Sequence, residues 1–258
     1  MSRFINLEFG GEAEDQSQRE TQGLARDEHY YLHEAEAAFE RGDFEKALRH
    51  YGKVLEFNPQ NASAWTAQVR MLIELRQYQD ANAWADKALE TFAREAELLA
   101  AKAVALARNG DLKGALVFSD LSIEKQADTP QVWLARGDVL LGRKEARADY
   151  CFEKALLLAP GNWVILWLAG RVRLYHGQFA AALQLAQQAI GREAGHFVLW
   201  LEQGRCQESL GLVNAAKDSF ARALELEPDC PAATEALTRL RSHGIGDSMR
   251  AWWRRLKK

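Results

Sequence analysis

The sequence predicts an all-α fold, a solenoid of six stacked helical pairs closed by a capping helix. Two observations predict it. A pattern of small, aromatic and turn-forming residues returns about every 34 residues over most of the 258-residue chain. Within each repeat, apolar residues recur at steps of three and four, which is the period of an amphipathic helix. Because one helical pair cannot bury its apolar side alone, neighbouring pairs are expected to stack.

The second helix of the repeat is defined by a constant spacing. A glycine is followed by a small residue, an aromatic residue, a second small residue and a proline in two distant segments. These residues are Gly42, Ala47, Tyr51, Val54 and Pro59, and Gly211, Ala216, Phe220, Ala223 and Pro228. The glycines suit the left-handed conformation at the end of a preceding helix. Asp43 and Asp111 are expected to cap the helices that follow, because their side chains can accept bonds from free backbone N–H groups.

The first helix opens with a large apolar residue, and a small residue usually follows four positions later. The large residues are Tyr31, Trp65, Leu99, Trp133, Leu166 and Trp200, and the residues that follow are Ala35, Val69, Ala103, Gly137, Gly170 and Gly204. Small side chains let two helix backbones approach closely. The predicted units are 28–61, 62–95, 96–129, 130–162, 163–196 and 197–230. The fourth unit is one residue short, in the turn near residues 144–146, and residues 231–243 are expected to form the capping helix.

This pattern resembles the tetratricopeptide-repeat family, whose repeats carry a tryptophan and a glycine on the first helix and alanine, an aromatic residue and proline on the second. The resemblance covers residues 28–230 and implies a right-handed α–α superhelical solenoid of six tetratricopeptide repeats. The chain departs from the family pattern at Arg76, where glycine is usual. Alanine also replaces the terminal proline at Ala93, Ala127 and Ala194.

In this family the first helices line an inner groove that holds a partner protein or peptide. The groove residues that the resemblance implies are Leu32, Glu36, Phe39, Arg70, Ile73, Val104, Leu134, Asp138, Trp167, Arg171, Leu174, Leu201 and Arg205. We expect Trp167 to offer apolar area to the partner and the arginines to pair with the partner's carboxylates. The alternative is that some of these residues face neighbouring helices. The paired lysine and asparagine that clamp a C-terminal carboxylate in some members are absent, because Leu32, Glu36 and Ala67 stand at those places.

Both ends of the chain lie outside the repeats. Residues 1–27 combine an apolar motif, Phe4, Ile5, Leu7 and Phe9, with a polar and acidic stretch, which indicates a flexible extension. One hypothesis is that residues 3–9 dock in a groove, of the same chain, of a second copy in self-association, or of a separate partner. The alternative is a disordered start whose apolar residues have no role.

Residues 244–258 form a basic, tryptophan-rich tail. If residues 247–258 are helical, one side carries Met249, Trp252, Trp253 and Leu256, and much of the remainder carries Arg250, Arg254, Arg255, Lys257 and Lys258. This composition is typical of interfacial helices on anionic membranes, and it could also attract a phosphate backbone. The tail could equally pack on the solenoid or on a partner protein, or be plainly disordered.

The sequence predicts a binding protein and no enzyme. No catalytic, cofactor or metal motif is complete: His33 and Glu34 begin like a zinc-protease helix, but Ala37 stands where the second histidine is required. The net charge of −3 argues against nucleic acid as a partner. Three cysteines and no signal peptide indicate the cytoplasm, with a peripheral membrane position as an option through the tail. The leading interpretation is a scaffold or adaptor; the alternative is a self-assembling or membrane-tethered assembly factor.

Overall fold

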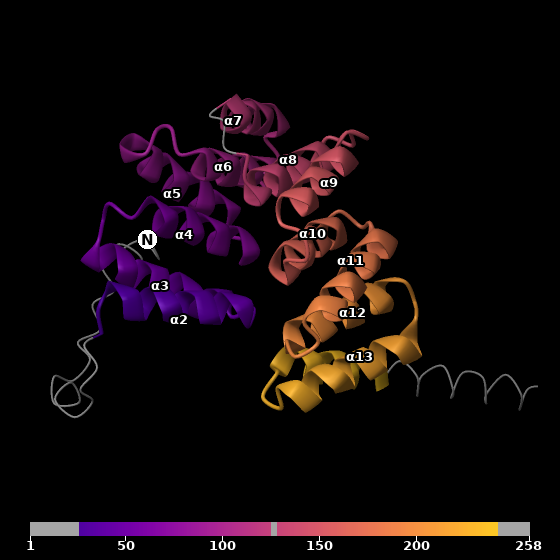
Figure 1. Cartoon of the computed structure of the whole chain (residues 1–258). Coiled ribbons are helices and arrows are strands. Elements are labelled where there is room, and N and C mark those ends of the chain that lie inside the picture. Colours follow the sequence, from indigo (N-terminus) through magenta and orange to yellow (C-terminus); the bar gives the residue numbers. More distant parts are fainter. Residues whose placement is uncertain (1–25, 125–127, 242–258) are drawn as a thin grey trace, which may run out of the picture. The chain divides into compact units, whose positions relative to one another are not determined.

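The computed structural model describes residues 26–124 and 128–241, and those residues form helices with no strand (Figure 1). The predicted all-α helical-repeat fold is therefore confirmed. The helices are α2 (Glu28–Glu40), α3 (Phe44–Phe57), α4 (Ala62–Glu74), α5 (Tyr78–Thr91), α6 (Ala96–Arg108), α7 (Leu112–Glu124), α8 (Pro130–Gly142), α9 (Ala148–Leu158), α10 (Trp163–Tyr175), α11 (Phe179–Arg192), α12 (Phe197–Ser209) and α13 (Val213–Leu226). A last helix covers residues 231–241.

The chain divides into two compact units between Leu158 and Ala159. In each unit the helices pack in sequential pairs, such as α2 with α3 and α12 with α13. We number the repeats one to six by their first helices, α2, α4, α6, α8, α10 and α12, and call the helix that follows each the second helix. Repeats one to four belong to the first unit. Repeats five and six and the helix over residues 231–241 belong to the second.

Side-chain caps and left-handed residues define the helix ends. Asp43 accepts a bond of 3.0 Å from the backbone N–H of Lys46, and Asp111 accepts one of 2.9 Å from Gly114, so both predicted caps are confirmed. Gly42 has a φ of 70°, the left-handed conformation expected at that turn. In repeats two and four the same conformation falls on Arg76, with φ 60°, and Lys144, with φ 59°. Side chains with a Cβ adopt this conformation only at an energetic cost.

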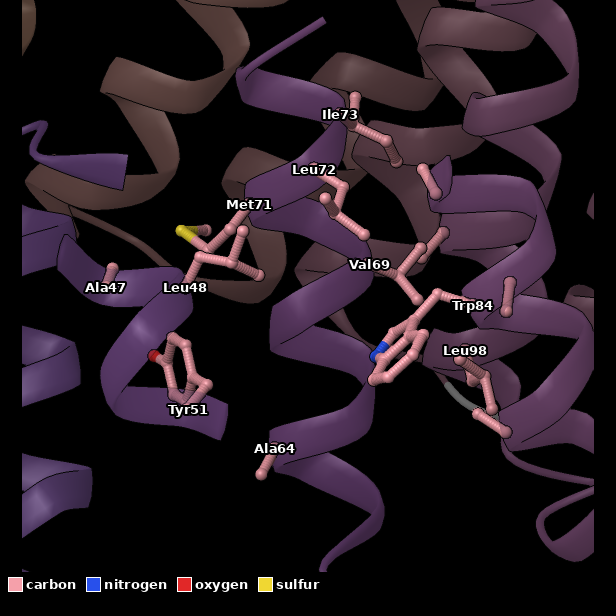
Figure 2. Close-up of a cluster of buried hydrophobic side chains, with 14 of the residues drawn as sticks. Ala47, Leu48, Tyr51, Ala64, Val69, Met71, Leu72, Ile73, Trp84 and Leu98 are labelled. Atoms are coloured by element: carbon pink, nitrogen blue, oxygen red, sulfur yellow. The ribbon is translucent and has the colours of Figure 1, made fainter. Parts of the chain in front are cut away.

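The core of the first unit is centred on repeats one and two. Its largest members include Tyr51, Leu72 and Trp84, and Figure 2 shows the Trp84 ring beside Val69 and Leu98. The indole Nε1 of Trp84 donates to the side-chain oxygen of the buried Gln68, so the polar atom of this ring is satisfied within the core. Burying such aromatic and aliphatic side chains is the main favourable term in forming the stack.

The core of the second unit depends on a close contact between the two helices of repeat six. A Cβ added at Gly204 of α12 would lie 2.6 Å from Cε1 of Phe220 on α13, so only glycine leaves room for this ring. Ala233, Ala236 and Leu240 of the helix over residues 231–241 are buried in the same cluster. This helix covers the apolar side of repeat six, as a capping helix should.

The three cysteines, Cys151, Cys206 and Cys230, are free and buried. Burial raises the pKa of the Cys151 thiol, and it raises that of Cys206 to about 12. These two thiols are therefore protonated at neutral pH and behave as small apolar core residues.

Two substitutions within the second unit test the helix contact. Gly204→Ala is expected to lower the free energy of unfolding by about 1–3 kcal/mol, because the new methyl group overlaps Phe220. Gly170→Ala serves as the control, since its Cβ would meet its nearest atoms at 3.6 Å. It should be neutral, or stabilising by up to ~1 kcal/mol through helix propensity. Urea unfolding measures both changes, and equal effects of the two variants would contradict the account.

Replacing Arg76 with glycine should stabilise the first unit. The left-handed conformation costs an L-residue ~1–2 kcal/mol, and the greater flexibility of glycine in the unfolded chain offsets part of that gain. We expect Arg76→Gly to raise the free energy of unfolding by about 0.5–1 kcal/mol, measured by urea unfolding. Arg41→Gly is the comparison, because Arg41 has an ordinary helical φ of −83° and should lose stability instead.

Candidate functional site

The candidate site is the set of residues that sequence analysis assigned to the first helices. The structure buries about half of them between helices: Ile73, Val104, Leu134, Asp138, Trp167 and Leu201. The others keep accessible surface: Leu32, Glu36, Phe39, Arg70, Arg171, Leu174 and Arg205. We call these accessible residues the first-helix face.

Trp167 does not offer the apolar surface expected of it. Its side chain is 2% exposed, and its ring lies 6.2 Å from that of Trp163. The guanidinium carbon of Arg171 lies 5.4 Å from the Trp167 ring centroid, a favourable cation–π distance. The expectation that a partner gains by covering Trp167 is therefore wrong, because this side chain is already buried.

The arginines of the face already have carboxylate partners within the chain. Arg70 of α4 donates to Glu97 of α6 at 2.8 Å. In the second unit Arg171 and Arg205 both reach the buried Glu202 of α12, at 3.4 and 3.2 Å. The expectation that these arginines pair with a partner's carboxylates therefore needs correction, because a partner must compete with these internal pairs or bind beside them.

The most buried of these ion pairs joins α6 to α8. Arg108 donates to Oδ2 of Asp138 from Nε at 3.0 Å and from Nη2 at 2.6 Å, and the side chains of both residues are almost inaccessible. Burial alone would lower the pKa of Arg108. The charges of Asp138 and of Glu74 on α4, together with the hydrogen bonds, outweigh burial and raise it above its usual value. Arg108 therefore stays charged and links α6 to α8.

A related pair joins repeat six to the capping helix. Arg239 donates to both carboxylate oxygens of Glu208, at 2.9 and 2.8 Å. The residues of these inter-helix pairs are separated by 27 to 31 positions, slightly less than one repeat. Sequence analysis missed the partners Glu97, Arg108, Glu202 and Arg239. The available signal was an acidic and a basic residue about 30 positions apart on successive first helices.

On α2, the accessible part of the face is acidic and partly apolar. Glu36 of α2 is exposed, and Leu32 and Phe39 are half-buried beside the core. Glu36 lies close to the buried hydroxyl of Tyr51. Burial in the first place, and the charge of Glu36 next, raise the pKa of Tyr51 to about 12. This end of α2 therefore presents negative charge next to accessible apolar carbon.

The structure also bears on the metal and membrane interpretations. His29, His33 and Glu36 lie on α2, but the described residues contain no group of three or more histidine, cysteine, aspartate or glutamate side chains placed to hold a metal ion. Within residues 26–124 and 128–241, no helix has the length and apolar character needed to span a bilayer. The predicted N-terminal motif at residues 3–9 and the tail residues Met249, Arg250, Trp252, Trp253, Arg254, Arg255 and Leu256 lie outside the described residues.

The chain has the fold of a helical-repeat protein, and comparison with known sequences gives the family. A family model described as the tetratricopeptide repeat matches residues 38–104 and 173–240, which is more than half of the chain. The chain therefore belongs to the tetratricopeptide-repeat family, as the sequence pattern predicted.

The individual proteins that this chain is similar to share low sequence identity with it. The BBSome complex member BBS4 of Bos taurus is 26% identical over 188 residues, which are 72% of this chain and 36% of that protein. The protein CTR9 homolog of Arabidopsis thaliana is 33% identical over 110 residues, 42% of this chain and 10% of its own length. This chain thus spans about a third or less of these relatives. A tetratricopeptide repeat protein from Parabacteroides merdae superposes with a TM-score of 0.54 at 14% identity, covering 87% of this chain and 88% of that one. That likeness supports the fold alone.

The buried ion pair can be tested by removing one partner. Asp138→Asn leaves Arg108 charged and poorly compensated in apolar surroundings, so we expect the first unit to lose on the order of 3 kcal/mol of unfolding free energy. The matched control is Glu56→Gln, which removes the exposed pair that Glu56 forms with Lys53 at 3.2 Å. It should cost less than ~1 kcal/mol. Urea unfolding distinguishes them, and a loss at Asp138 as small as the control's would contradict a structural role for the pair.

Proposed function

We propose that this chain is a protein–protein interaction scaffold that holds a partner protein or peptide on the first-helix face. The observation that carries the proposal is the combination of accessible charge and half-buried apolar carbon on successive first helices. In the first unit these residues are Leu32, Glu36 and Phe39, and in the second they include Leu174 and Arg205. Accessible apolar area bordered by charge is the usual composition of an interaction surface.

The internal ion pairs support binding by a preformed surface. Arg70 and Glu97 hold α4 against α6, and Arg171 and Glu202 hold α10 against α12. A surface whose helices are already fixed loses little conformational entropy when a partner binds, so more of the contact energy remains as affinity. The family adds support, since a relative, BBS4, is named as a member of a protein complex.

The charges of the face indicate what a partner must offer. Near Glu36 the first unit favours a basic or hydrogen-bond-donating side chain, because no ion pair to Glu36 is formed among the described residues. In the second unit Arg205 is accessible but shares Glu202 with Arg171. A partner carboxylate there would bind beside an existing ion pair, and its contribution to the binding free energy would be smaller than at an arginine without a partner.

Paired substitutions test the face. Glu36→Lys in the first unit and Arg205→Ala in the second should each reduce recovery of a bound partner by about three- to tenfold, corresponding to ~0.7–1.4 kcal/mol. The measurement is quantitative mass spectrometry of proteins that co-purify with the tagged full chain.

The controls carry the same chemical changes on second helices. Glu90→Lys lies on α5, and Arg222→Ala removes an exposed pair with Glu225 on α13. Both should retain every partner. If the face variants and the second-helix variants recover the same proteins in the same amounts, the first helices are not the binding surface.

A further inference from the structure

The helix over residues 231–241 corresponds in position to the first helix of a further repeat. Its exposed residue Thr238 stands 34 positions after Gly204 of α12, and Thr234 lies one turn earlier on the same side of the helix. In repeat six the second helix packs at this place, because Phe220 fills the space that a Cβ at Gly204 would need. The side that carries Thr234 and Thr238 is therefore the side on which a second helix would pack.

Both threonines can be buried without leaving a hydroxyl unsatisfied. Oγ1 of Thr234 donates to the backbone carbonyl of Cys230 at 3.1 Å, and Oγ1 of Thr238 donates to that of Thr234 at 2.9 Å. Thr66 of α4 makes the same kind of bond to Ala62 and is 2% exposed, so the stack already buries a threonine of this type. A helix packed on this side would meet methyl groups and would break no hydrogen bond.

The second helices that follow a turn glycine bury the same positions. The glycines are Gly42, Gly110, Gly177 and Gly211, all with positive φ. The fifth, ninth and twelfth residues after each glycine are buried. These buried residues are Ala47, Tyr51 and Val54; Ala115, Ser119 and Ser122; Ala182, Ala186 and Ala189; and Ala216, Phe220 and Ala223. The distance from the glycine therefore identifies the side of a second helix that faces the stack.

The sequence after residue 241 has the same spacing. Gly244 follows Gly211 by 33 positions, which is the length of the predicted fourth unit. The fifth, ninth and twelfth residues after Gly244 are Met249, Trp253 and Leu256. Trp252 stands 33 positions after Ser219, which is also buried in α13. All four large apolar residues of this segment thus match the four buried positions of α13.

Basic residues of the segment match the exposed side of α13. Arg254, Arg255 and Lys258 stand 33 positions after residues of α13 that are exposed. Those exposed residues are Ala221, Arg222 and Glu225. A single step of 33 residues therefore places the apolar residues at buried positions and these basic residues at exposed ones. That agreement favours a helix packed in the stack over an amphipathic helix with no relation to the repeats.

We propose that residues 231–258 form a seventh repeat, in which residues 247–258 are the second helix and pack on the side of the first helix that carries Thr234 and Thr238. Only residues 242–246 connect the two helices, a usual length for a helix–helix connection. So short a connection gives the segment a high effective concentration at this surface. The proposal is independent of partner binding at the first-helix face.

Hydrogen exchange of the full chain, followed by mass spectrometry, tests the proposal. The reference is the free peptide of residues 247–258, because a helix of this length is marginal in isolation. In the full chain the backbone amides of residues 250–257 should exchange at least about tenfold more slowly than in the free peptide.

Paired alanine variants separate packing from helix formation. Trp252→Ala with Trp253→Ala should remove most of this protection, because the apolar side of the helix is lost. Arg254→Ala with Arg255→Ala should retain it, because those residues match exposed positions. Alanine favours helix in both variants, so a difference between them reports on packing.

A substitution on the first helix gives the reciprocal test. Thr238→Lys should speed exchange in residues 250–257 by at least about fivefold, because it places a charge beneath the tryptophans. Gln184→Lys, at an exposed residue of α11, is the control and should leave exchange there unchanged.

Three outcomes would overturn the proposal. The first is exchange in the full chain as fast as in the free peptide. The second is equal protection in the tryptophan and arginine variants. The third is protection that appears only when vesicles containing phosphatidylserine are added, because the tryptophans would then lie in a membrane surface and not in the stack.

Discussion

The close approach of the two helices within a repeat is the contact on which the rest of the architecture depends. In repeats four and six it occurs where a glycine faces an aromatic ring, Gly137 against Phe152 and Gly204 against Phe220. Because the ring lies directly on backbone, the pair forms a thin layer whose outer apolar sides the next repeat can cover. Larger side chains at these glycines would separate the helices and expose the surface that stacking is meant to bury.

In addition to this apolar contact, ion pairs fix the position of one repeat against the next. Arg70 with Glu97 and Arg108 with Asp138 act between first helices of the first unit, and Arg171 with Glu202 does so in the second. Hydrophobic packing is weakly directional, whereas the two nitrogens that Arg108 directs at Asp138 fix both distance and orientation. The same residues limit what the first-helix face can bind, since much of its charge is already compensated.

The features predictable from sequence were those set by local chemistry. The turn glycines, the Asp43 and Asp111 caps and the small residues of the first helices follow from backbone and steric rules that act within one repeat. The exposure of each first-helix residue was less predictable, because it depends on how far that helix is rotated against its neighbours. Trp167 was expected to be accessible and is buried, and Arg70 was expected to pair with a partner's carboxylate but pairs with Glu97 of the chain itself. The pairing of Arg70 depends on a residue of another helix, 27 positions away.

The burial of Arg108 and Asp138 has a consequence for how the first unit comes apart. Arg108 and Asp138 belong to neighbouring repeats, so opening of repeat three or of repeat four alone breaks this pair and both of its hydrogen bonds. Helical-repeat arrays otherwise tend to lose their repeats one at a time. An ion pair between the two repeats raises the free energy of the state in which only one of them is unfolded. Repeats three and four therefore behave as one cooperative block whose opening is nearly all-or-none.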